Sequence, residues 1–317
     1  MRRTYLTGLL VLALAGLPNI LRAEDLVSEA LAGFPPETIR VEFSSPAKLR
    51  KLSNYQNLRQ RYVGPRLQAL ESALAELGVR EESIDDLMLG WQPGKGDMGL
   101  YGFASGRFDP KAIAESAAAR GMSPSPVAGE QAYCLEAGLA GSCVVVLGNS
   151  LGAFGTLTSL TAMLEGRAGQ GSSLSSSDRL ARLIGDAKKD APIWGVAVGV
   201  AVGDWFRGWM PNQGNLKLDW GRVFETVESL VYSVEAGEKV KLDLKLDCTT
   251  TEDATTLRQV LEGLKLAQQL AWQDRNPNRP NPFEGMEISL SGRQISLQVT
   301  TGYSELELAG GVAAPSN

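Results

Sequence analysis

The spacing of apolar residues in the first half of the chain predicts alternating strands and helices. Apolar and polar positions alternate at residues 38–43, as in a strand, and apolar positions recur at helical spacing at residues 67–77. Ser45 and Pro46 form a favoured helix start, because serine caps the first turn and proline fits its first position. The further elements expected here are strands at 86–92, 100–108, 131–136 and 142–147, and helices at 109–120, 156–166 and 177–188.

A strand predicted at residues 193–202 has side chains of different size on its two faces. Valine occupies every second position from Val196 to Val202, whereas the positions between them hold glycine or alanine. A face of small residues would let a helix or loop approach the sheet closely.

The C-terminal part has the clearest alternation. In the strand at 239–248, Lys and Asp alternate from residue 241 to residue 247 and form a polar face, while the other face is apolar. Thr250 and Asp253 match a capping box that opens a helix reaching about residue 273. The four strands expected in this part are at 230–235, 239–248, 286–290 and 295–299.

Both halves therefore show the order strand–strand–helix–strand–strand. We predict an α+β protein of two related units, with predominantly antiparallel sheets that helices cover on one face. The expected divisions are a signal peptide (1–23), a first unit with a long N-terminal helix (24–203), an aromatic-rich connector (204–227), a second unit (228–309) and a loose tail (310–317).

The first 23 residues have the order of regions found in a secretory signal peptide. Arg2 and Arg3 precede an uncharged apolar run at 6–17, and Pro18 then breaks it. This run is too short to span a bilayer, which needs roughly 20 residues, and no later run is long and apolar enough. The sequence predicts export to the periplasm or the exterior. An uncleaved anchor is the alternative, because Leu21 is large for its place before the cleavage site.

Composition excludes several kinds of chemistry. The chain contains no histidine, so Ser-His-Asp and Cys-His catalysis lack a general base, and histidine-based zinc sites lack ligands. Removing residues 1–23 takes away three of the 31 basic residues and none of the 36 acidic ones, which leaves a net charge of −8. A negative surface repels phosphate backbones and argues against nucleic acid as a partner. We expect no cofactor and no metal site.

Four short motifs have structural interpretations that we prefer to their functional ones. The G-x-G-x-x-G match at 94–99 precedes a predicted strand, whereas a dinucleotide site needs a helix there, so we expect a hairpin loop. The G-x-S-x-G match at 148–152 lacks the histidine that a nucleophilic serine needs, so we expect a turn. Ser45 to Lys48 matches S-x-x-K, but Ser45 is also a helix cap, and K-T-G and S-D-N motifs are absent. Residues 274–285 resemble a calcium loop but have arginine where glycine is required.

The three cysteines divide into a pair and a single thiol. Cys134 and Cys143 lie on neighbouring predicted strands, and a symmetric hairpin places them opposite each other, within disulfide range. An oxidising compartment would favour the bond, and two reduced core thiols are the alternative. Cys248 lies on the apolar face of its strand, and we expect it to be a buried free thiol.

An aromatic segment between the two units is our candidate binding patch. Two of the six tryptophans lie within one turn, and Trp205 and Trp209 share a face if the segment is helical. Large aromatic side chains most often fill the space between domains, which is the structural interpretation. The functional hypothesis is an exposed anchor for a partner or an apolar ligand, formed by Trp205, Phe206, Trp209 and Met210.

Four strings along the chain carry a resemblance to uncharacterised exported bacterial proteins of the kind encoded in acidobacterial genomes. These strings are GFASGRF at 102–108, APIWG at 191–195, WFRGWMP at 205–211 and the Asp247-Cys248 strand end before its helix. The resemblance implies an exported two-domain α+β protein. It assigns no activity, cofactor or catalytic residue.

These observations favour a non-enzymatic protein of the cell envelope or exterior that binds an envelope protein or an apolar ligand. Two alternatives stay open: a carrier of an apolar small molecule, and a histidine-independent hydrolase that uses a Ser-Lys pair or carboxylates. A large, closed apolar pocket would favour the carrier. A cleft with converging Asp, Glu or Lys side chains would favour the enzyme.

We expect the mature protein to begin near Glu24, because the basic start, the apolar run and the polar break end there. N-terminal sequencing of protein isolated from the native host checks this. Soluble cytoplasmic protein that retains Met1 would contradict export, whereas membrane-bound protein that retains Met1 would show the uncleaved anchor.

Overall fold

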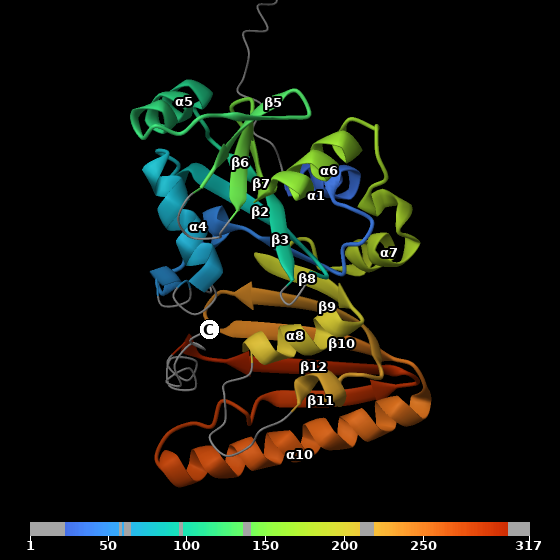
Figure 1. Ribbon diagram of the computed structural model, residues 1–317. Helices are drawn as coiled ribbons and strands as arrows, with labels where there is room; N and C mark the ends of the chain where they lie inside the picture. Colours follow the sequence, from blue (N-terminus) through green and yellow to red (C-terminus); the bar gives the residue numbers. More distant parts are fainter. Residues whose placement is uncertain are drawn as a thin grey trace, which may run out of the picture.

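The computed structural model describes residues 23–56, 59, 65–94, 98–135, 141–209 and 219–303. Within these ranges the chain forms one twelve-stranded sheet with helices on both faces (Figure 1). No helix in them is long and apolar enough to cross a membrane. Residues 1–22 of the predicted signal peptide, the predicted loop at 95–97 and the predicted tail at 310–317 lie outside the described residues.

The helices and strands follow the order expected from the sequence with few exceptions. The helix at Ala23–Gly33 was not predicted, and the expected long N-terminal helix is wrong because the helix that begins at Pro46 ends at Leu49 and turns follow at 51–54. The helices are α1 (Ala23–Gly33), α2 (Pro46–Leu49), α4 (Pro65–Glu76), α5 (Pro110–Ala119), α6 (Leu157–Arg167), α7 (Asp178–Asp186), α8 (Val200–Trp209), α9 (Trp220–Val223) and α10 (Thr251–Arg275). The strands are β1 (Arg40–Ser44), β2 (Ile84–Gln92), β3 (Gly99–Gly106), β4 (Ser125–Val127), β5 (Glu130–Cys134), β6 (Ser142–Leu147), β7 (Leu151–Thr156), β8 (Ile193–Val198), β9 (Val227–Ala236), β10 (Val240–Cys248), β11 (Met286–Ser291) and β12 (Gln294–Thr301).

Side-chain caps start the helices where the sequence predicts them. The Ser45 hydroxyl accepts a hydrogen bond from the Lys48 backbone N–H at 3.3 Å and so begins α2. Asp109 caps α5 in the same way. Thr250 and Asp253 form the predicted capping box of α10, with bonds of 3.1 Å in both directions. These local signals fix where the chain leaves each strand and turns into a helix.

The strands form a single sheet in the order β11-β12-β10-β9-β8-β1-β2-β3-β7-β6-β5-β4, and every neighbouring pair is antiparallel. This corrects the expectation of more than one sheet, and the described residues do not show two repeated units. The reason is β1, which pairs with β2 on one side and with β8 on the other and so joins the halves. The sequence did not predict β4 or β7, and β7 separates β3 from β6.

Helices cover the two faces of the sheet unequally, whereas we expected cover on one face only. Around β1 to β7, α1, α6 and α7 pack on one face, and α4 and α5 pack on the other. Around β9 to β12, α8 and α10 pack on the face that α4 and α5 also cover, which we call the α10 face. On the opposite side of β9 to β12 no helix of the described residues covers the sheet, and we call this side the open face.

A partly buried polar network lies on the α10 face at the centre of the sheet. Arg40 Nη2 donates to Glu42 Oε2 at 2.8 Å, and the Tyr232 hydroxyl donates to the same carboxylate oxygen. The Arg40 guanidinium lies 4.1 Å from the ring centroid of Trp91, in cation–π contact. Burial raises the pKa of Tyr232 well above its usual value, so the phenol stays protonated and donates.

Strand β8 is shorter than predicted, because Val200 and Val202 belong to α8 rather than to the strand. Gly199 has a φ of +56° and turns the chain out of the sheet, after which α8 begins. The small residues of β8 do allow a close approach, as expected, but the neighbour is a side chain. A Cβ on Gly195 would lie 2.5 Å from the Tyr232 hydroxyl oxygen, so only glycine leaves room for that ring.

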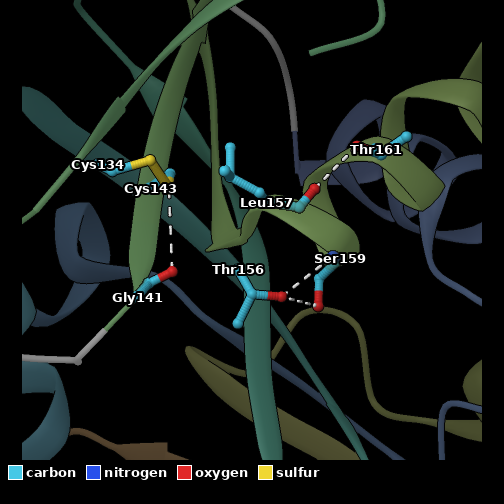
Figure 2. The surroundings of a disulfide bond; sticks show 7 residues. All are labelled: Cys134, Gly141, Cys143, Thr156, Leu157, Ser159 and Thr161. Atoms are coloured by element: carbon cyan, nitrogen blue, oxygen red, sulfur yellow. Dashed lines mark hydrogen bonds between the residues drawn. A yellow bond between two sulfur atoms is a disulfide. The ribbon is translucent and has the colours of Figure 1, made fainter. Parts of the chain in front are cut away.

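The structure confirms the predicted disulfide between Cys134 and Cys143, which lie opposite each other on β5 and β6. Figure 2 shows the bond at the edge of this hairpin, with the Cys143 sulfur 3.9 Å from the carbonyl oxygen of Gly141. In the same view Thr156 caps α6 through Ser159. Cys248 is free and buried, and burial raises its pKa to about 11, which keeps it an unreactive thiol at neutral pH.

Replacing Cys134 and Cys143 with alanine should lower the free energy of unfolding by about 2–3 kcal/mol, because the bond closes a loop of about ten residues in the unfolded chain. Chemical denaturation without reductant measures the difference, and the natural protein with reductant is the control. Peptide mapping of unreduced protein should show the Cys134–Cys143 link. A link to Cys248 instead would contradict the assignment.

Candidate functional site

A cleft of about 240 Å³ lies on the open face, between the sheet and the segment that follows α7. Its floor comes from three adjacent strands, β9, β10 and β12. Its wall comes from the end of α7 and the residues just after it. The lining residues are Asp186, Lys188, Val231, Tyr232, Ser233, Asp243, Leu244, Lys245, Ser296 and Gln298.

Strand alternation and register bring the polar side chains of the floor together. Ser233 lies opposite Asp243, which in turn lies opposite Gln298 on the next strand. Lys245 lies opposite Ser296. Since residues two apart on a strand share a face, all these side chains point to the open face while the leucines between them point to α10.

Some charges in the cleft are already paired and others are not. Lys188 forms an ion pair with Glu235, and this hydrogen bond raises the pKa of Lys188. Lys241 Nζ lies 3.1 Å from Asp243 Oδ2, but Asp243 Oδ1 is buried and has no hydrogen-bond partner within the described part of the chain. A buried carboxylate oxygen without a donor is costly, and the Lys241 ammonium on the other oxygen offsets part of this cost.

Two further charges in the cleft, on Lys245 and Asp186, have no ion-pair partner among the residues that the structure describes. The Lys245 ammonium can donate three hydrogen bonds, and the Asp186 carboxylate can accept several. Serine and glutamine side chains between them can donate or accept. The cleft therefore presents one positive and one negative side chain, both exposed to solvent, to a small molecule.

The residues described contain no group of three or more Asp, Glu or Cys side chains placed to hold a metal ion. The possible calcium loop at 274–285 comprises the last two residues of α10 and the connection to β11, where Asn281 donates to the carbonyl oxygen of Gln269. This contact gives Asn281 a structural role in closing the connection.

Ser45 and Lys48 do not form a catalytic pair in this structure. The Ser45 side chain is 1% exposed and caps α2, while Lys48 Nζ donates to the Asp190 carbonyl oxygen at 3.1 Å. Burial raises the pKa of the nearby Asp86 carboxyl. Ser105, opposite Asp86 on β3, is also 1% exposed, so a substrate in solvent would not reach either hydroxyl.

The aromatic segment predicted as a binding patch contributes to the core where it is described. Trp205 is 1% exposed and its ring centroid lies 4.7 Å from that of Tyr232. Phe206 is 3% exposed and stacks on Phe224 at 3.9 Å. This placement corrects the expectation of an exposed anchor for these two residues. The Trp209 side chain and Met210 lie outside the described residues, so their part of the patch stays a prediction.

Sequence reasoning identified the polar face of β10 but not the cleft. The Lys and Asp alternation at 241–247 is the signal that could have pointed to it. Asp186 and Lys188 are far in sequence from residues 241–247, and only the pairing of β8 with β9 brings them over the open face.

Comparison with known proteins shows the fold and no more. No family model matches the chain, and no curated protein matches it. Among solved structures the chain is similar to TP0453, a Treponema protein. Crystal form I of TP0453 gives a TM-score of 0.53 at 11% identity, covering 88% of this chain and 95% of that one. Crystal form III gives 0.51 at 10% identity, covering 89% and 96%.

Trp205→Ala should lower the free energy of unfolding by about 3–5 kcal/mol, because it leaves a cavity against Tyr232 and Phe206. Chemical denaturation measures this, and Arg207→Ala on the same helix, whose side chain is 60% exposed, is the control and should change little. If Trp205→Ala left the stability unchanged but abolished binding of a partner, Trp205 would belong to the binding patch after all.

Proposed function

We propose that this protein is a non-enzymatic binding protein of the cell envelope or exterior. We propose further that the cleft on the open face binds a small zwitterionic ligand, such as an amino acid or a short peptide. The observation that carries this is the pair of opposite charges in the cleft without an ion-pair partner among the described residues: the Lys245 ammonium and the Asp186 carboxylate. A ligand with one group of each sign would pair with them.

Two independent features support a location outside the cytoplasm. The first is the signal-peptide pattern of residues 1–23. The second is the Cys134–Cys143 disulfide, because such bonds persist mainly in oxidising compartments. The resemblance to exported bacterial proteins agrees with both.

The character of the cleft supports binding of a polar ligand over the two alternatives. A carrier of an apolar molecule needs an enclosed apolar cavity, whereas this cleft is open to water, and eight of its ten lining residues are polar or charged although much of the surface they present is aliphatic. Acidic and basic side chains do converge here, as an enzyme would require. However, a nucleophilic serine also needs a hydrogen bond to its base, and no described hydrogen bond joins a cleft serine to a lysine.

Lys245→Gln should weaken ligand binding about tenfold or more, because a hydrogen bond to a charged group contributes about 1.5–3 kcal/mol. The measurement is calorimetric titration of the purified protein with each free amino acid and with dipeptides that join each amino acid to alanine. Lys239→Gln, an exposed lysine on the β9–β10 turn outside the cleft, is the matched control and should bind as the natural protein does.

Two results would contradict this proposal. The first is that no amino acid or dipeptide of the panel binds the natural protein. The second is that Lys245→Gln and Lys239→Gln bind equally well. Hydrolysis of a dipeptide during the titration would favour the enzyme instead.

A further inference from the structure

The two edges of the sheet differ in how well they are protected from pairing with another strand. One edge is β4, which has three residues with Pro126 at its centre, and proline withholds an N–H from an incoming strand. The other edge is β11, which has six residues, no proline and one charged residue, Glu287. An edge of this second kind is a template for strand addition.

The register of β11 shows which of its backbone groups point outward. The Thr300 N–H donates to the Gly285 carbonyl, so this pair is hydrogen-bonded across the β11–β12 ladder. Bonded and non-bonded pairs alternate along an antiparallel ladder. The backbone N–H and C=O groups of Met286, Ile288 and Leu290 therefore point away from the sheet.

Of Met286, Ile288 and Leu290, only Met286 has outward backbone groups that are hydrogen-bonded within the described part of the chain. The Met286 N–H donates to the Phe283 carbonyl, and the Met286 carbonyl accepts from Lys265 Nζ at 2.5 Å. The N–H and C=O groups of Ile288 and Leu290 have no partner among the residues described. These four groups form the open part of the edge.

An exposed apolar surface adjoins this open edge. Leu266 and Leu270 of α10 are 57% and 59% exposed, one turn apart on the helix. Lys265, beside Leu266, reaches Met286, and Gln269, beside Leu270, donates to Phe283, so this half of α10 lies next to β11. In Figure 1 the helix runs along the end of the molecule beside β11. From residue 263 to residue 273 the helix carries one charge, that of Lys265.

We propose that β11 is the interface of a homodimer, in which it pairs antiparallel with β11 of a second copy about a two-fold axis at Ser289. This register places Ile288 opposite Leu290 of the second copy, and Leu290 opposite Ile288. All four open groups of each copy are then hydrogen-bonded. The bond between Lys265 and Met286 stays in place.

A second copy fits this edge because the strand is complementary to itself. A two-fold axis perpendicular to the sheet keeps the α10 faces of both copies on the same side. Ile288 and Leu290 then meet on that face, while Ser289 meets Ser289 on the open face. Glu287 lies opposite Ser291 of the second copy, so no like charges face each other. Because α10 lies beside β11, the axis also brings the two α10 helices, with the exposed Leu266 and Leu270, to the same side of the paired sheet.

A single cysteine tests the register, because cross-strand neighbours at the axis lie within disulfide range. Purified full chain with Ser289→Cys should form a cross-linked dimer under mild oxidation, seen on a non-reducing gel and by mass spectrometry. Gln298→Cys is the matched control: it is exposed on the same face of β12, one strand from the edge, and should not cross-link. The natural cysteines do not interfere, since two are bonded and Cys248 is buried.

Sedimentation velocity over a concentration series tests the dimer itself. The natural chain should sediment as a dimer that dissociates on dilution. Leu290→Pro removes one outward N–H and no bond to β12, so it should sediment as a monomer with an unchanged circular dichroism spectrum. Leu266→Lys, at an exposed position, should shift the equilibrium toward monomer without loss of folding.

Three results would overturn the proposal. The natural chain could sediment as a monomer at every concentration. It could form a dimer that Leu266→Lys and a folded Leu290→Pro leave intact. Equal cross-linking of Ser289→Cys and Gln298→Cys would also contradict the register.

Discussion

The partly buried ion pair between Arg40 and Glu42 on β1, shared with the buried Tyr232 of β9, is the interaction on which the architecture depends. A charge taken out of water costs several kcal/mol unless it is paired and hydrogen-bonded. Glu42 meets this requirement only when Arg40 and the Tyr232 hydroxyl both reach it. Since Gly195 of the intervening β8 must leave room for the Tyr232 ring, the network fixes β1, β8 and β9 in one order and one register.

A continuous sheet follows from this constraint, and the continuous sheet creates the open face. Helices α1, α6 and α7 cover one side of the N-terminal strands, and the same side of β9 to β12 has no helix above it within the described residues. The end of α7 then meets uncovered polar strands, which gives the cleft its wall and floor. A sheet split into two units would have separated Asp186 and Lys188 from Asp243 and Lys245.

The cleft and the edge of β11 are compatible surfaces. The cleft lies on the open face, whereas the exposed leucines of α10 lie on the opposite side of the sheet. Pairing through β11 would therefore leave both clefts of a dimer accessible, on the same side of one extended sheet. The disulfide stabilises the far end of the sheet, where β4 and β5 are short and contribute few hydrogen bonds of their own.

The sequence by itself determined the local structure. Local sequence determines the helix caps at Ser45, Asp109 and Thr250 and the alternation in β10 and β12. Each of these features depends on neighbours within a few residues, so the local sequence pattern predicts it. Hairpin symmetry also placed Cys134 opposite Cys143. The tertiary structure alone decided that α8 replaces the end of a predicted strand, that Trp205 is buried against Tyr232, and that one sheet takes the place of two. Those outcomes depend on partners up to about two hundred residues apart, and no local pattern encodes which distant strand will satisfy a buried charge.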